Sequence, residues 1–229
     1  MRDIYKNKLN QVLQEQQYTS KDIVHSNLTD MRKCGVRDVD DLNRALNSHY
    51  DQLHSIVYAS FHDSRLNLET YELITKFTNL KHINLSCTNI NDDGLKHLVS
   101  LHNLQSISLG DTNITDDGLK HLIRLKKLTN LFLDSTGISD DGAKYLALMD
   151  NLTTLDLDDT KITDEGLKHI TLLKNLKTLN IRYIRITDKG LKYLAILPNL
   201  EILRIELDKM DGKVIKYLMS HNSNLHVSL

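Results

Sequence analysis

The stretch "NITDDGLKHL", residues 113–122, decides the fold, because it returns along the chain at a fixed interval of 24 residues. The copies are "NDDGLKHL" (91–98), "TDDGLKHL" (115–122), "SDDGAKYL" (139–146), "TDEGLKHI" (163–170) and "TDKGLKYL" (187–194). Seen once, two carboxylates beside a glycine, a lysine and a histidine suggest a catalytic or calcium-binding loop. Five evenly spaced copies instead indicate a structural unit that is repeated along the chain.

A second pattern, Leu-x-x-Leu-x-Leu-x-x-Thr-x-Ile, precedes each copy. In "LQSISLGD" (104–111) the alternating apolar residues predict a short strand with one buried side. A repeat of 20–29 residues that contains one strand and one helix is typical of leucine-rich repeats. The unit resembles the repeats of bacterial GALA-type leucine-rich proteins and of F-box-associated repeat proteins, and "GAKYLA" (142–147) resembles the motif that names the former.

The resemblance implies an α/β fold, a curved solenoid with short parallel strands on its concave face and helices on its convex face. We expect this solenoid to span residues 56–229, with five regular repeats over about 80–199 and a degenerate repeat at each end. Residues 1–55 show a helical pattern of apolar residues, and we predict that they form an N-terminal helical cap over the first repeat.

The repeated polar residues have structural interpretations. Thr115 or Asp116 is expected to cap the helix that follows, and Lys120 lies four residues after Asp116, as an ion pair on a helix requires. We expect the threonine of each strand pattern to satisfy backbone groups in the turn. Ile184 replaces that threonine, which suggests an altered turn or an exposed apolar patch. For the column that contains His97 and His121 we favour stacking on the convex face over metal binding.

Candidate binding residues are those that break the period on the exposed side of the strands. Phe132 is expected to point outward as an aromatic anchor. The acidic candidates form a patch in the middle repeats: Asp111, Asp134, Asp156, Asp158 and Asp159. The basic candidates lie beside it: Arg182, Arg185 and Arg204, with Tyr183 between them. Two alternatives stay open: the aspartates and arginines pair with one another while Phe132 packs on its neighbours, or Asp156, Asp158 and Asp159 bind calcium.

The composition narrows the class of function. Lys and Arg number 29 against 30 Asp and Glu, so no bulk charge favours nucleic acid or an anionic membrane. Cys34 and Cys87 form no disulfide framework, and we find no membrane span, no signal peptide and no sequence motif for a metal or a cofactor. We therefore expect a non-enzymatic, cytoplasmic module without a cofactor. It would bind a protein partner with a basic surface through the concave face.

Two further predictions concern the ends of the chain. The resemblance to F-box proteins suggests an effector-type adaptor, delivered into a host cytosol, whose N-terminal helices recruit a ubiquitin ligase. The leucine–proline opening of F-box domains is missing, because Pro198 is the only proline. At the other end, "NLHVSL" (224–229) predicts a strand at the edge of the sheet, through which two copies would form a homodimer.

Overall fold

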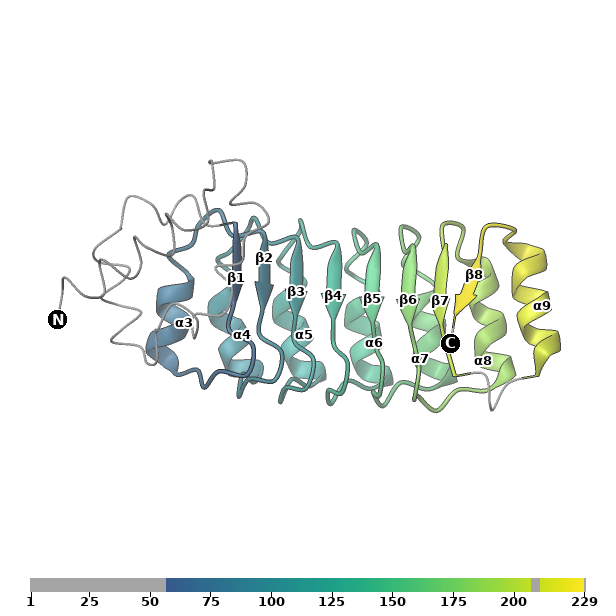
Figure 1. Ribbon diagram of the computed structural model, residues 1–229, viewed down its shortest axis with the longest axis horizontal. Coiled ribbons are helices and arrows are strands. Elements are labelled where there is room, and N and C mark those ends of the chain that lie inside the picture. The colour runs from purple at the N-terminus through teal and green to yellow at the C-terminus, as the bar shows by residue number, and fades with distance from the viewer. Residues whose placement is uncertain (1–56, 207–210, 229) are drawn as a thin grey trace, which may run out of the picture.

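The computed structural model describes residues 57–206 and 211–228, which form one sheet of eight parallel strands backed by a row of helices (Figure 1). The strands are β1 Tyr58–Ser60, β2 His82–Asn84, β3 Ser106–Ser108, β4 Asn130–Phe132, β5 Thr154–Asp156, β6 Thr178–Asn180, β7 Ile202–Arg204 and β8 His226–Ser228. The helices are α3 Leu68–Ile74, α4 Asp92–Leu98, α5 Asp116–Leu122, α6 Asp140–Leu146, α7 Asp164–Ile170, α8 Asp188–Tyr193 and α9 Gly212–His221, with the 3-10 helix η3 Leu194–Ile196 after α8.

The predicted fold class is confirmed. Strands and helices alternate, and the strands follow one another across the sheet in chain order. Packed helices need about 8–10 Å each whereas paired strands need about 4.8 Å, so the strands line the concave face and the helices the convex face. The N-terminal helical cap was predicted for residues 1–55, which lie outside the described residues.

Neighbouring strands pair at a constant shift of 24 residues. Ile107 on β3, for example, pairs with Ile83 on β2 and with Leu131 on β4. Equivalent positions therefore form columns across the sheet. The inward columns of leucine and isoleucine build one continuous core in which Leu104, Ile107 and many equivalents are fully buried. The outward columns form the concave surface.

The turns after β2, β3, β4 and β5 are held as predicted. The Thr88 hydroxyl donates a hydrogen bond of 2.7 Å to the carbonyl of Leu85, and three later threonines do the same in their own repeats. Ile184 takes the place of threonine without altering the turn, because Tyr183 has φ 55° and the equivalent Asp159 has φ 51°. The expected altered geometry is therefore wrong. Ile184 is buried, and the exposed apolar surface belongs to Tyr183.

The predicted ion pairs between an aspartate and the lysine four residues later are not formed. Four of the lysines pair instead with the acid three residues before them, as Lys144 does with Asp141 at 2.6 Å, whereas Lys192 has Lys189 at that position. The first acid, Asp116 in α5, faces the next repeat, where it accepts hydrogen bonds from the backbone and hydroxyl of Ser139. The same bridge joins Asp92 to Thr115, Asp140 to Thr163, and Asp164 to Thr187. Two directed hydrogen bonds to a partly covered carboxylate outweigh one exposed ion pair.

This bridge explains the glycine of the repeated stretch. A Cβ atom on Gly142 would lie 2.2 Å from Oδ1 of Asp116, closer than any real contact. The helix cap is also settled, because Thr115 is the N-cap residue and its hydroxyl accepts the N–H of Asp117. The repeated stretch thus supplies three things: a residue that caps the helix, an aspartate that bonds to the next repeat, and a glycine that leaves room for the aspartate of the preceding repeat.

The convex face carries the histidine and tyrosine column. His97 stacks on Tyr71 of the preceding helix with ring centroids 5.8 Å apart, and Lys120 lies over the ring of Tyr145. Within residues 57–206 and 211–228, no cluster of His, Cys, Asp and Glu side chains is placed to hold a metal ion. Over the same ranges, no helix has the length and apolar character that crossing a bilayer requires.

Candidate binding surface

Phe132 lies at the centre of the concave face. It is the last residue of β4, and it pairs with Ser108 on β3 and with Asp156 on β5. Its side chain is half-buried, whereas the adjacent Leu131, which points inward, is fully buried. The alternation of the strand therefore places the aromatic ring on the exposed sheet, as predicted.

Three acidic side chains lie beside this position and are called the acidic cluster: Asp156 on β5, and Asp134 and Asp158 in the segments that follow β4 and β5. The Asp134 carboxylate packs directly over Gly110, since a Cβ atom on that glycine would lie 2.4 Å from its oxygens. Burial raises the pKa of Asp134 above its ordinary value, and the negative charges of Asp156, Asp158 and Asp111 raise it further. No lysine or arginine of the described part of the chain forms an ion pair with Asp134. The cluster therefore keeps an excess of negative charge.

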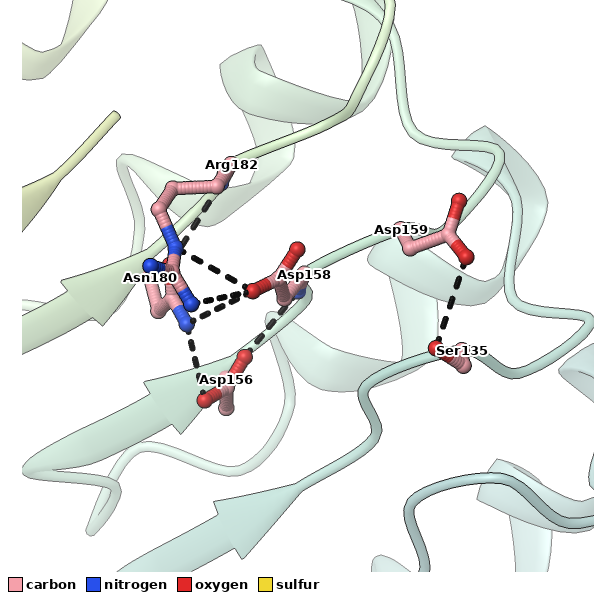
Figure 2. Close-up of polar contacts among 6 residues, drawn as sticks. All are labelled: Ser135, Asp156, Asp158, Asp159, Asn180 and Arg182. Carbon is pink, nitrogen blue, oxygen red and sulfur yellow. Dashed lines mark hydrogen bonds and ion pairs between the residues drawn. The ribbon is translucent and has the colours of Figure 1, made fainter. Parts of the chain in front are cut away.

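One arginine enters the acidic cluster. The Arg182 guanidinium donates to Oδ2 of Asp158 from Nη2 at 2.8 Å and from Nε at 3.2 Å (Figure 2). Asn180, which is 4% exposed, donates its amide hydrogens to Asp156 at 3.0 Å and to Asp158 at 3.4 Å. Bonds from a charged fork and a buried amide fix both carboxylates in the plane of the concave face. The alternative in which aspartates and arginines pair is therefore realised at Asp158 and Arg182.

Asp158 has a second oxygen that this network does not reach. Its Oδ1 atom is buried and has no hydrogen-bond partner among the described residues. A buried acceptor without a donor costs about 1–3 kcal/mol.

Asp111 and Asp159 lie apart from this network. Both occupy the exposed left-handed position of the turn after a strand, with φ 53° and 51°. The Ser135 hydroxyl donates to Asp159 at 3.4 Å, on the side away from Arg182 (Figure 2). Asp156, Asp158 and Asp159 do not converge on one point, and the calcium alternative has no cluster of ligands to support it among the described residues.

The predicted basic residues are brought together only in part. The Arg182 guanidinium lies 5.9 Å from the ring centre of Tyr183, which is 60% exposed. Arg204 is exposed on β7, in register with Asn180. The backbone of Arg185 forms an isolated parallel β-bridge with that of Thr163, in the turns beyond the sheet. The predicted arginines are therefore divided: Arg182 and Arg204 belong to the concave side, and Arg185 lies in a turn beyond the sheet. Arg182 is in addition paired with Asp158.

The sequence did not single out Asn180, which organises the network. The sequence signal for Asn180 is weak, because asparagine is common at outward positions of a strand. Its role becomes visible only when the 24-residue register places Asp156 beside it on β5.

Comparison with known proteins agrees with this architecture. A family model described as "Leucine Rich repeat" matches residues 78–99, 100–122, 150–170 and 173–195. The repeats are leucine-rich repeats. A search of the curated proteins finds no match to the chain.

Solved structures with leucine-rich repeats have a similar fold. One is an internalin (inlF) from Listeria monocytogenes, 20% identical, with a TM-score of 0.63 over 84% of this chain and 50% of that protein. Another is an internalin C2 (inlC2) from the same species, 24% identical, with a TM-score of 0.56 over 78% of this chain and 83% of that protein. The chain thus spans about half the length of the first internalin. At this identity the likeness concerns the fold alone, and it gives no support to the GALA-type or F-box-associated resemblance in particular.

Proposed function

We propose that the chain is a non-enzymatic binding module whose concave face holds a protein partner with a basic surface. Repeat solenoids in general offer a broad concave face that is rigid and can be varied residue by residue. Here that face carries a half-buried aromatic, Phe132, between Ser108 and Asp156 on the neighbouring strands. Large aromatics within a polar surround are typical of residues that dominate binding energy.

The uncompensated charge of the acidic cluster carries this proposal. Burial raises the pKa of Asp134, three neighbouring carboxylates raise it further, and no lysine or arginine of the described residues forms an ion pair with it. A lysine or arginine of a partner would supply the missing positive charge.

Affinity capture with matched variants tests the proposal. The concave variant combines Phe132→Ala with Asp156→Lys. The control combines Tyr217→Ala with Asp141→Lys on the outer helices, and so makes the same chemical changes on the opposite face. Partners that the wild type and the control retain, and the concave variant loses, would support the proposal. Retention of every partner by a folded concave variant would refute it.

Two earlier predictions concern other surfaces. The effector-type adaptor role rests on residues 1–55, outside the described residues, and stays a prediction. The homodimer would form through β8, the last strand of the sheet, which pairs with β7. Measuring the mass of the protein in solution at several concentrations tests the dimer.

A further inference from the structure

A groove of about 580 Å³ lies along the edge of the sheet at which the strands begin. Its walls come from the loops that lead from each helix to the next strand, over five successive repeats. The residues that line it are Gln105, Lys126, Lys127, Thr129, Asn151, Thr153, Asn175, Lys177 and Asn199. It is separate from the acidic cluster, because Thr129 precedes Asp134 by five residues, or about 16 Å of extended chain.

The chemistry of this groove is basic. Three lysines line the groove together with amide and hydroxyl side chains, and its lining contains no carboxylate. The Lys127 ammonium is held by the side-chain oxygen of Asn103 at 2.7 Å, and that of Lys177 pairs with Glu201 at 2.9 Å. Lys126 is exposed, and within residues 57–206 and 211–228 no hydrogen bond or ion pair engages its ammonium group. The groove therefore offers positive charge that the rest of the fold uses little.

A row of exposed apolar side chains belongs to the same loops. Leu148, Leu172 and Ile196 occupy equivalent positions in three successive repeats and are 58%, 57% and 63% exposed. Each lies three residues before an asparagine of the groove wall, Asn151, Asn175 or Asn199. Apolar side chains of this size, aligned along a surface, contribute to an interface when they are covered.

We propose that this groove binds an extended acidic segment of a protein partner, in which acidic residues alternate with apolar ones. An extended chain advances about 6.8 Å every two residues. The loops of successive repeats are spaced between the strand distance of about 4.8 Å and the helix distance of about 8–10 Å. A segment along the solenoid can therefore direct one side chain in two towards the lysines and the others towards the apolar row.

The lining of the groove favours a polypeptide over a nucleic acid. Single-stranded nucleic acids are held by aromatic side chains on which the bases stack, and the groove wall contains none. The lysines are also interrupted by neutral amides at Asn151 and Asn175, whereas a phosphate backbone carries charge at every step. The proposal goes beyond the concave-face function and does not depend on it.

Fluorescence anisotropy with a labelled peptide of alternating glutamate and leucine tests this inference. We expect the wild type to bind it, and Lys126→Glu with Lys127→Glu to weaken binding by at least about tenfold. Leu172→Ser should weaken it as well. The matched control reverses two exposed lysines on the outer helices, Lys192→Glu with Lys216→Glu, and should bind within about twofold of the wild type.

Three results would overturn the proposal. One is the absence of binding by the wild type. Another is equal weakening in the groove variant and the outer-helix control, which would mean that only net charge matters. A third is tighter binding of a single-stranded oligothymidine than of the peptide. The concave variant, Phe132→Ala with Asp156→Lys, should keep its affinity for the acidic peptide, so failure of this proposal is distinguishable from failure of the proposed function.

Discussion

The carboxylate of Asp116 accepts two hydrogen bonds from Ser139 in the next repeat, one from its backbone N–H at 2.8 Å and one from its hydroxyl. A residue in the first turn of one helix thereby holds the cap of the following helix. Because solenoid stability depends on interfaces between nearest neighbours, this bridge couples the repeats to one another.

We predict that Asp116→Ala lowers the free energy of unfolding by about 1–3 kcal/mol, because it removes two hydrogen bonds to a charged group. Asp117→Ala is the matched control, since the side chain of Asp117 forms an exposed ion pair with Lys120 and its loss should have no measurable effect. Urea unfolding followed by circular dichroism measures both. Equal losses in the two variants would contradict the bridging role of Asp116.

Gly142→Ala should destabilise the protein although alanine favours helices by about 1 kcal/mol. The added Cβ atom would meet Oδ1 of Asp116 and displace it from Ser139. Gly212→Ala in α9 serves as the control, because its Cβ would meet nothing within 4 Å. We also expect Asp116→Ala with Gly142→Ala to cost less than the sum of the single changes, since both disrupt the same contact. Simple additivity in urea unfolding would rule out that shared cause.

Leu131 and Phe132 are adjacent, but their substitutions should differ sharply. Leu131→Ala empties a fully buried site and is expected to cost about 2–5 kcal/mol. Phe132→Ala removes a half-buried side chain from the concave face and should cost about 1 kcal/mol or less. Thermal and urea unfolding of the two variants provide the comparison. A loss at Phe132 as large as that at Leu131 would make the ring a structural residue rather than a binding anchor.

The fold follows from the sequence because the 24-residue period fixes which residues share a column. The period identifies Leu104 and Ile107 as core and Phe132 as outward-facing without any knowledge of contacts between repeats. It does not reveal that Asp116 faces Ser139, because helix spacing within one repeat suggests a lysine as its partner. Contacts between repeats depend on how successive units stack, and a pattern within one unit does not contain that geometry.

The candidate site shows the same division. The alternation within the strands correctly places Asp134, Asp156 and Asp158 on one surface. It does not predict that Asn180 is buried between two carboxylates, and it leaves open whether Arg182 pairs with an aspartate. Those contacts depend on side-chain rotamers and on the strand register. The basic groove was missed for a related reason, since its lysines lie in separate loops that only the solenoid brings together.

Asp134 should make stability depend on pH. Its pKa is raised in the folded protein, chiefly by burial, so the folded state holds its proton at pH values where the unfolded state has already lost it. Stability therefore falls as pH rises from the unfolded pKa, roughly 3.9, through the raised folded pKa. We expect Asp134→Asn to raise the melting temperature at pH 7 and to lose this advantage below about pH 4. Calorimetry at several pH values would contradict this account if Asp134→Asn were destabilising at pH 7.

The central claim is that Phe132 and the acidic cluster form the surface that holds a partner. It is tested most directly by the dissociation constant of a captured partner, measured by titration against the wild type, the concave variant and the outer-helix control. The account predicts that Phe132→Ala with Asp156→Lys raises the constant by about a hundredfold or more, since an aromatic anchor and a charge contact are both lost. Tyr217→Ala with Asp141→Lys should leave it within about twofold. An unchanged constant in a folded concave variant would contradict the claim.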